Sequence, residues 1–206
     1  MPRDPVCGMP ISKRDAEFEI SLRGKTYYFD SEYCRDTFLT GSRVAYFSME
    51  VGLANAMHSY SGGLGVLAGD MIRSSADLKI PMVAVTLISK KGYIKQELSD
   101  DGTQMEKSDD WEPSEFMEEL PGLVNVKIEN RDVATKAWLY DYTSPTGGLV
   151  SILFLDTDLE ENEEQDRAIT DYLYGGDAGY RLKQEAILGI GGVRILQESG
   201  FTISKY

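Results

Sequence analysis

Histidine, cysteine and long apolar runs are scarce in this chain of 206 residues. It has one histidine, His58, so no site that needs two imidazoles can form, and its only cysteines are Cys7 and Cys34. No uninterrupted apolar run approaches the ~20 residues of a membrane helix, and no run of signal-peptide length follows the N-terminus. These absences predict a cytoplasmic protein with no membrane partner.

Basic residues are also fewer than acidic residues. The chain has 21 lysines and arginines against 34 acidic residues, a net charge of −13, which repels a phosphate backbone. We therefore expect no nucleic-acid partner. No G-x-S-x-G elbow accompanies His58, which argues against a serine hydrolase. Two cysteines in an intracellular protein are expected as free thiols or metal ligands rather than as a structural disulfide.

Residues 1–41 have a pattern of their own. Alternating residues at 18–22 and strand formers at 26–29, on either side of a turn at 23–25, predict a β-hairpin. A short helix carrying Cys34 is expected next. A unit of about 40 residues buries little core alone and is usually supported by a metal, a disulfide or a neighbouring domain.

After a linker at 40–42, the pattern of residues 42–206 predicts a second domain of the α/β class. A short apolar run at 44–47 and a continuous apolar run at 82–88 are typical of parallel strands. The glycine-rich segment SGGLG at 61–65 opens a helix between them. The apolar positions that indicate this helix are Leu64, Leu67, Ala68, Met71 and Leu78.

The rest of the chain is expected to continue this alternation. The predicted elements are an acidic surface segment at 99–122, strands at 124–128, 133–142 and 149–155, helices at 165–174 and 180–198, and a strand from 201. Gly189, Gly191 and Gly192 would each cost that last helix about 1 kcal/mol. Their presence predicts that another backbone approaches there.

The first candidate site combines Cys7, Asp30 and Cys34. The hairpin could bring Cys7 against the start of the short helix, giving two thiolates and a carboxylate. A closed zinc site takes four ligands, and only three are in view. The alternative is two buried thiols in a small aromatic core. That core would consist of Phe18, Tyr28, Phe29, Tyr33 and Phe38.

The motifs DPVCGM at 4–9 and TYYFDSEYC at 26–34, with Phe38, resemble a YHS domain. This short module is found on metal transporters and enzymes and is associated with metal binding. The resemblance covers nearly all of residues 4–39. It implies a metal ion held by Cys7, Asp30 and Cys34. Many members have cysteine where this chain has Asp30, a departure that argues against a soft metal.

The second candidate site is the glycine loop at 61–65. A turn of glycines that runs into a helix leaves backbone N–H groups unpaired, and the helix dipole favours an anion there. The loop lacks the lysine of G-x-x-x-x-G-K-[ST] and does not fit G-x-G-x-x-G, so no nucleotide motif is indicated. A tight turn with no ligand is the alternative.

Several collinear segments around this loop resemble the N-terminal part of α-glucan phosphorylases of the short bacterial and archaeal type. They are VAYFSME at 44–50, YSGGLGVLAGD at 60–70, SADL at 75–78, KGYIKQ at 91–96, WEP at 111–113, LYGGD at 173–177, RLKQE at 181–185 and GIGGVR at 189–194. The resemblance implies phosphorolysis of an α-1,4-glucan to glucose 1-phosphate, with pyridoxal phosphate as cofactor. It also implies the GT-B fold of two Rossmann-like domains, of which residues 42–206 would form an incomplete N-terminal one.

The same resemblance assigns roles to the loop. Gly62 and Gly63 would offer their amides to the substrate phosphate, and Leu64 would lie beside the sugar. Glu50 would hold the loop backbone or orient a cation, although a strand-end carboxylate in solvent is the alternative. We expect His58 to be a non-catalytic loop residue. Trp111 and Tyr93 are expected to be packing anchors, with stacking on a sugar as the alternative.

In this family the lysine that holds pyridoxal phosphate belongs to the second domain, and nothing in this chain corresponds to it. We therefore expect the chain to be inactive alone and to act with a C-terminal phosphorylase chain or to self-associate. A non-catalytic module that binds a metal, a glucan or phosphate is one alternative. A GT-B transferase that uses a nucleotide sugar is another, since those enzymes share the GGLG loop. The segments at 44–50 and 181–185 favour the phosphorylase.

Overall fold

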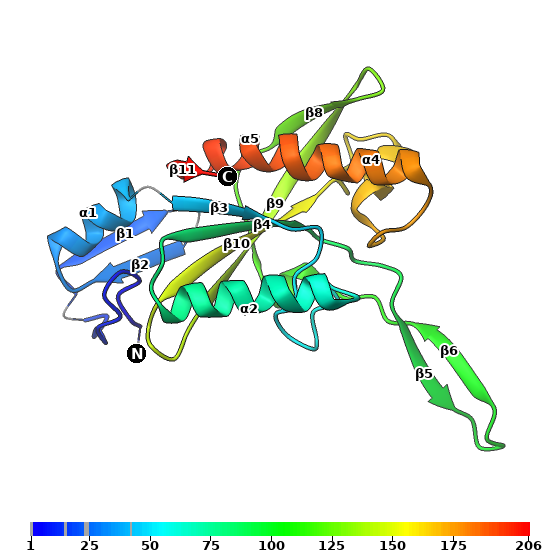
Figure 1. Cartoon of the computed structure of the whole chain (residues 1–206), viewed down its shortest axis with the longest axis horizontal. Helices are drawn as coiled ribbons and strands as arrows, with labels where there is room; N and C mark the ends of the chain where they lie inside the picture. Colours follow the sequence, from blue (N-terminus) through cyan, green and yellow to red (C-terminus); the bar gives the residue numbers. More distant parts are fainter. Residues whose placement is uncertain (1, 15, 23–24, 42) are drawn as a thin grey trace.

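A mixed sheet forms the centre of the computed structural model, which describes residues 2–14, 16–22, 25–41 and 43–206. Four strands of this sheet are parallel, and the sheet continues with antiparallel strands on one side (Figure 1). The order is β11 (Ile203–Lys205), β3 (Arg43–Phe47), β4 (Met82–Leu87), β10 (Leu149–Asp156), β9 (Arg131–Thr143) and β7 (Glu118–Glu119), with β8 (Val124–Ile128) also paired to β9. The predicted α/β class is confirmed.

Helices cover both faces of the sheet (Figure 1). Helix α2 (Gly63–Asp77) packs on one face, where Ile72 contacts the core that includes Met82 and Phe154. On the other face lie α4 (Ala178–Ala186), the π-helical turn η3 (Ile187–Gly191) and α5 (Gly192–Glu198). Every residue of β4 is buried because its side chains alternate between these two cores, as its unbroken apolar run predicts.

The direction of winding reverses at β3. From β3 the chain crosses through α2 to β4 on one side, whereas the last strand, β11, adds to the other side of β3. In open α/β sheets ligands bind at the carboxyl ends of the strands where this reversal occurs. The loop that follows β3, which carries Glu50 and the glycine segment, is therefore at the position that the topology favours for a site.

Apart from Ile72, the large apolar residues of helix α2 and its C-cap lie on the side away from the sheet. Leu64, Leu67, Met71 and Leu78 are all exposed, whereas Gly65, Ala68, Gly69, Ile72 and Ala76 are buried. The small residues are required because a Cβ on Gly69 would overlap the carbonyl oxygen of Gly52. The helix was predicted from its large apolar residues, but its core face consists mostly of small ones.

The expected close approach to the glycines of the last helix is corrected by the structure. A Cβ on Gly192 would lie 2.6 Å from the ring of Phe47 and 2.9 Å from Val85, while one on Gly189 would meet nothing within 4 Å. Side chains of β3 and β4 therefore approach this helix, rather than another backbone. The helix is continuous only through the π-helical turn that contains Gly189 and Gly191.

The N-terminal unit consists of β1 (Phe18–Leu22), β2 (Lys25–Phe29) and α1 (Glu32–Thr40). The expected turn at 23–25 falls partly, and the linker residue Ser42 wholly, outside the described residues. The predicted aromatic core is partly wrong, because Tyr33 is 77% exposed and Tyr28 is only half-buried. The buried residues of this core are Tyr27, Phe29, Cys34 and Phe38.

The N-terminal unit docks on the sheet through a buried carboxylate. Asp141 on β9, whose side chain is 3% exposed, pairs with Lys25 at 2.8 Å and accepts hydrogen bonds from Tyr27 at 2.9 Å and Ser151 at 2.7 Å. Two turns also touch across this boundary. Gly8 (φ +79°) packs against Gly147 (φ +89°) so closely that a Cβ on Gly147 would lie 2.7 Å from the Cα of Gly8.

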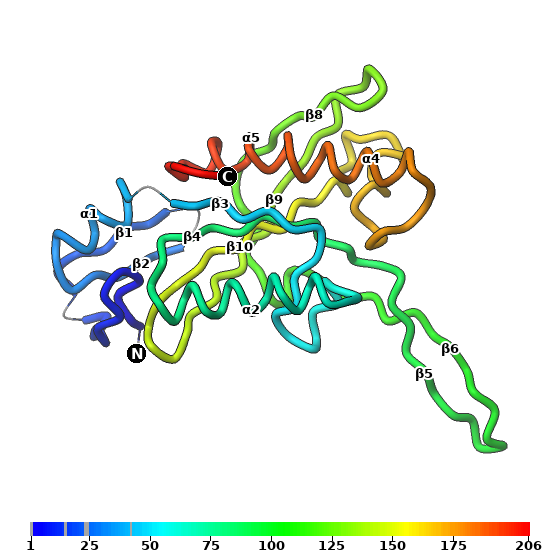
Figure 2. Tube along the Cα trace, viewed as in Figure 1, coloured from blue at the N-terminus to red at the C-terminus, as the bar shows by residue number. Residues whose placement is uncertain are grey.

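The segment between β4 and β8 departs from the prediction. Strands β5 (Ile94–Leu98) and β6 (Gln104–Ser108) form a hairpin that projects from the rest of the molecule (Figure 2); residues 99–122 were expected to be surface loop with some short structure, and the hairpin itself was not predicted. A short 3₁₀ turn, η1 (Pro113–Glu115), follows. The helix expected at 165–174 is shorter, consisting of α3 (Glu164–Arg167) and the 3₁₀ turn η2 (Ala168–Thr170). Within the described residues, no helix is both long and apolar enough to cross a bilayer.

Candidate functional site

The glycine loop connects the region after β3 to the first turn of α2, and a buried carboxylate organises it. Glu50 is 2% exposed. Its Oε2 accepts hydrogen bonds from the amide of Ser61 at 2.7 Å and from the amide of Gly62 at 3.1 Å. Glu50 is therefore not a strand-end carboxylate in solvent. It holds the backbone of the loop.

This arrangement corrects the expectation for Gly62. Its amide is used internally, because Glu50 lies within hydrogen-bond distance, so it is not available to a substrate phosphate. The amides of Gly63 and Leu64, at the first positions of α2, have no acceptor among the described residues. Gly63 and Leu64 are therefore the exposed residues of this helix N-terminus whose amides have no acceptor among the described residues.

The glycines of this segment fall into two groups. Gly65 is needed for packing, because an added Cβ would lie 3.0 Å from Glu50 Oε2 and overlap the side chain of Tyr60. A Cβ on Gly62 or Gly63 would meet open space, and neither glycine has a positive φ. Internal packing and backbone conformation therefore explain Gly65 but leave the surface above Gly62 and Gly63 open to a molecule from outside.

Tyr174 connects the loop to the other face of the sheet. Its hydroxyl donates to Glu50 Oε1 at 3.1 Å, and the guanidinium of Arg181 lies 5.2 Å from its ring centre. Burial and the nearby Glu50 carboxylate raise the pKa of Tyr174 to about 12. The residue has a φ of +54°, a conformation that is uncommon for a side chain of this size.

The residue-level prediction missed Tyr174, although its LYGGD motif was noted. The two glycines after it form a turn, and Gly176 has a positive φ. This glycine turn directly after a tyrosine was the sequence feature that could have marked Tyr174 as a site residue. Only the fold, however, brings residues 50 and 174 together.

A hollow of about 500 Å³ lies beside the loop, lined by Asn55, Met57, His58, Tyr60, Ser61 and Tyr93. His58 stacks on Tyr93, with ring centres 4.8 Å apart, and its Nε2 lies 2.9 Å from Asp109. Tyr93 donates its hydroxyl to the carbonyl of Tyr60. These contacts hold the loop wall together, and they leave a polar and aromatic surface of the kind that suits a sugar.

Trp111, the other aromatic candidate, is a packing residue. It is buried, it donates its indole N–H to the carbonyl of Ser89 at 3.3 Å, and its ring packs against Phe116. It does not line the hollow beside the loop.

The second site is in the N-terminal unit and has four members. Asp4, Cys7, Asp30 and Cys34 bring one ligand atom each within 4.8 Å of one another. The sequence interpretation named three of these residues and missed Asp4, which begins the DPVCGM motif. Two thiols and two carboxylates supply the four ligands that a closed zinc site requires.

Backbone hydrogen bonds hold the carboxylate of Asp4 in this cluster. Asp4 is fully buried, and its carboxylate accepts the amides of Val6, Cys7 and Asp30 at 2.7 to 3.0 Å. Burial raises the pKa of Cys7, and it raises the pKa of Cys34 to about 12. For Asp30, burial favours the neutral acid, but hydrogen bonds from both thiols hold its pKa below the ordinary value. A metal would therefore have to displace thiol protons.

The residues present do not fit pyridoxal phosphate. No lysine of the described residues is hydrogen-bonded to the glycine loop or lines the hollow beside it. The chain therefore offers no amine at this site for a Schiff base.

Known proteins match both parts of the chain. Residues 3–41 match the model of the YHS domain. A maltodextrin phosphorylase of Thermococcus litoralis is 42% identical over 164 residues, which are 76% of this chain and 19% of the relative. A glycogen phosphorylase of Mycobacterium tuberculosis is 41% identical over 162 residues, or 75% of this chain and 18% of the relative. One from Aquifex aeolicus is 31% identical over 182 residues, or 85% of this chain and 25% of the relative.

The similarity to known proteins covers most of the chain but only a small part of the phosphorylases. The chain carries a YHS domain at its N-terminus, and about three quarters of it is similar to glycogen and maltodextrin phosphorylases. The chain spans about a fifth of the length of the phosphorylases of Thermococcus litoralis and Mycobacterium tuberculosis that it matches.

Proposed function

We propose that this chain, with its N-terminal YHS domain, is the N-terminal portion of an α-glucan phosphorylase. In this proposal residues 1–41 are the YHS module, and residues 42–206 are a partial Rossmann-like domain of the GT-B type. The protein acts in the cytoplasm, which agrees with the free thiols of Cys7 and Cys34. The reaction is cleavage of the terminal α-1,4-linked glucose by inorganic phosphate, giving glucose 1-phosphate.

One observation carries the proposal for the site. Within the described part of the chain, the amides of Gly63 and Leu64 have no acceptor; they lie at a helix N-terminus, under open space, at the point where the sheet reverses its winding. An oxyanion such as phosphate fits this position. Glu50 keeps the loop in place by accepting hydrogen bonds from the amides of Ser61 and Gly62. Leu64, 65% exposed, borders the same opening, where a sugar would lie.

The chain's own part in the reaction is to bind and orient. The two amides hold phosphate without a proton transfer, and the hollow lined by Tyr60 and Tyr93 offers a surface for the glucan end. Pyridoxal phosphate supplies proton-shuttle chemistry in the family. This chain presents no group to hold it, so we propose that the 206-residue chain alone does not turn over and needs a C-terminal phosphorylase chain.

Phosphate binding at the loop is tested by NMR titration of the ¹⁵N-labelled chain with inorganic phosphate. The amide signals of Gly63 and Leu64 should move most, and Gly63→Val should abolish the shifts because its side chain fills the open space. Gly189→Ala, which also adds atoms in open space, is the matched control and should bind normally. Equal binding by both variants would contradict the proposed phosphate site.

Catalysis is tested separately. The chain with pyridoxal phosphate, phosphate and maltodextrin should release no glucose 1-phosphate above background. Co-expression with the remaining part of a related phosphorylase should restore turnover. Robust turnover by the chain alone would refute the need for a partner.

A second function is favoured by the cluster of Asp4, Cys7, Asp30 and Cys34, whose ligand atoms lie within 4.8 Å. We propose that it binds a divalent metal such as Zn²⁺, with affinity that rises with pH because both thiols must lose their protons. Calorimetric titration with Zn²⁺ should show one site that Cys34→Ser removes. Asp36→Asn, on the exposed side of the same helix, should leave it intact, and equal affinity of both variants would contradict the site.

A further inference from the structure

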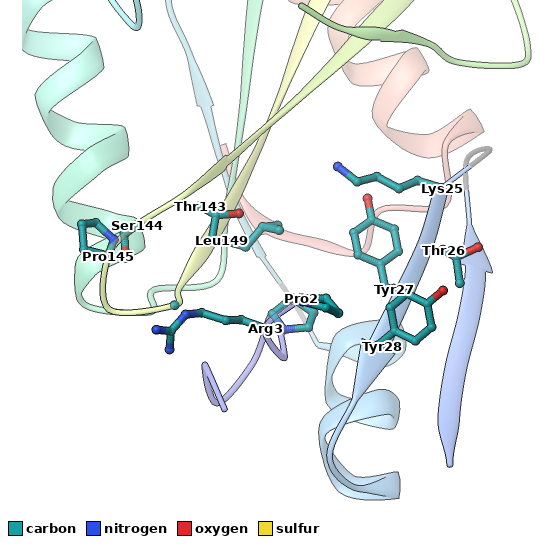
Figure 3. Close-up of a pocket in the computed structure, with 12 residues that line it drawn as sticks. Pro2, Arg3, Lys25, Thr26, Tyr27, Tyr28, Thr143, Ser144, Pro145 and Leu149 are labelled. Carbon is teal, nitrogen blue, oxygen red and sulfur yellow. The ribbon is translucent and has the colours of Figure 1, made fainter. Parts of the chain in front are cut away.

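A pocket of about 480 Å³ lies in the seam between the N-terminal unit and the sheet (Figure 3). One wall comes from residues 2–5 and from β2, and the other comes from the end of β9 and the turn that leads to β10. Figure 3 shows the tyrosines of β2 facing Leu149 and Thr143 across the opening, with Arg3 below them. We call this space the seam pocket.

The seam pocket is separate from the glycine loop. Its β9–β10 turn contacts the last residue of α2, where Thr146 donates to the carbonyl of Asp77 at 3.0 Å. The glycine loop is at the first residue of the same helix, and fifteen residues of α-helix span about 22 Å. A ligand in the seam pocket therefore does not occupy the proposed phosphate site.

The charge of the pocket is opposite to that of the chain. Arg3 and Lys25 line it, and no carboxylate among the residues that the structure describes does, although the net charge of the chain is −13. Lys25 is paired with Asp141. Arg3 uses one nitrogen on the carbonyl of Gly8 at 2.9 Å and has no ion-pair partner within the described ranges. Its remaining donors suit a phosphate, which a guanidinium binds through two parallel hydrogen bonds.

The rest of the lining suits a ring that carries hydroxyl groups. The half-buried ring of Tyr28 and the side chains of Pro5 and Leu149 supply apolar surface, while Thr143 and Ser144 supply hydroxyls. Aromatic and apolar surface with a few placed polar groups is typical of small-molecule sites. A further cation, Lys13, lies 5.7 Å from the ring centre of Tyr28.

We propose that the seam pocket binds a small phosphomonoester that carries a sugar ring. Arg3 holds the phosphate, and the ring lies against Tyr28. Hexose phosphates and nucleoside monophosphates share this chemistry, and the volume accommodates either. Because the pocket is built from both parts of the chain, such a ligand stabilises their docking by binding only when they are together.

Calorimetric titration of the whole chain with glucose 1-phosphate, adenosine monophosphate and inorganic phosphate tests this proposal. At least one ester should bind about tenfold more tightly than inorganic phosphate, since only the esters reach Tyr28. The ester that binds more tightly shows whether the pocket takes a hexose phosphate or a nucleoside monophosphate. Absence of ester binding up to about 10 mM would overturn the proposal.

Matched variants locate the ligand. Arg3→Gln should weaken ester binding about tenfold or more, whereas Arg14→Gln, which removes a charge outside the pocket, should not. Tyr28→Ala should weaken it, whereas Tyr33→Ala should not, because Tyr33 is exposed away from the pocket. Equal effects within either pair would overturn the assignment.

Two further variants distinguish binding in the seam pocket from binding at the glycine loop. Thr143→Trp fills the pocket from an exposed position and should abolish ester binding at the seam pocket even if Arg3→Gln disturbs folding. Gly63→Val, which blocks the proposed phosphate site, should leave the binding of adenosine monophosphate unchanged and should remove only the glucose 1-phosphate binding that occurs at the glycine loop. If Gly63→Val abolishes ester binding while Thr143→Trp does not, the ester binds at the glycine loop, and the seam-pocket proposal fails while the proposed phosphate site stands.

Discussion

At the scale of single residues, Glu50 determines what the glycine loop has left to offer. Its carboxylate accepts hydrogen bonds from the amides of Ser61 and Gly62, so the exposed amides left without an acceptor among the described residues are those of Gly63 and Leu64. The motif predicted that Glu50 supports the loop. The number of amides it occupies could not be predicted, because that depends on how the strand end and the turn meet in space.

Replacement of Glu50 by glutamine tests this support. Glu50→Gln keeps the shape but removes the charge, so unfolding should require about 1–2 kcal/mol less free energy, as measured in urea. The pKa of Tyr174 should fall from about 12 toward its ordinary value, since the carboxylate contributes to its rise. Ring-labelled tyrosine NMR measures this pKa. Glu112→Gln, at an exposed position, is the control, and an unchanged Tyr174 titration would contradict the coupling.

The thiol of Cys34 should be unreactive in the metal-free protein. With a pKa of about 12, on the order of one molecule in ten thousand carries the thiolate at pH 8. Alkylation by iodoacetamide, read by mass spectrometry, should modify Cys34 far more slowly in the native than in the unfolded chain. Rapid native alkylation would contradict its burial.

The same shift makes stability depend on pH. The pKa of Cys34 is higher in the folded chain than the ordinary 9.0 of an unfolded one, so the folded state binds this proton more tightly. Its contribution to stability is complete below pH 9 and is lost as the pH rises from 9 to about 12. Cys34→Ala should flatten the decline of unfolding free energy in that window.

At the scale of elements, α2 illustrates the limits of sequence patterns. Helical spacing predicted its position, but the residues that contact the sheet are small because the backbone of Gly52 lies directly against it. Strand β4 was easier to predict from the sequence, since burial on both faces requires an unbroken apolar run. The β5–β6 hairpin was missed because its exposed residues, such as Lys95 and Lys107, carry no core-facing alternation.

Two glycines of α2 should respond oppositely to alanine. Gly69→Ala places a Cβ against the Gly52 carbonyl and should lower the free energy of unfolding by about 2–3 kcal/mol. Gly63→Ala meets open space and should be neutral or slightly stabilising, because alanine favours helix. Urea unfolding of both variants makes the comparison, and similar losses would contradict the packing described.

At the scale of the whole molecule, the boundary between the YHS unit and the sheet depends on a carboxylate that no motif indicated. Asp141→Ala removes the ion pair with Lys25 and the acceptor of the hydrogen bond that the Tyr27 hydroxyl donates at 2.9 Å, and should cost about 2–4 kcal/mol. It should also separate the unfolding of the two parts into distinct calorimetric transitions. Asp132→Ala, on the same strand but exposed, is the control. A single unshifted transition in Asp141→Ala would contradict this role.

The outward apolar face of α2 should promote self-association. Leu67 and Met71 are 56% and 42% exposed on adjacent turns, and contiguous apolar surface of this kind is usually covered. Light scattering of the chain should show an apparent mass that rises with concentration. The double change Leu67→Glu and Met71→Glu should reduce it, whereas Leu98→Glu on the projecting hairpin should not. A wild-type chain that stays monomeric at all concentrations would contradict the prediction.

The paired turns at Gly8 and Gly147 have a consequence for the history of this chain. The backbone of each turn occupies the space that a side chain on the other would need, so neither position accepts a side chain while the two turns are docked. A phosphorylase-like sequence that acquires such an N-terminal module must already have a glycine in that hairpin or gain one at the same time. Grafting the module onto a relative would therefore require transplanting two short loops as a unit.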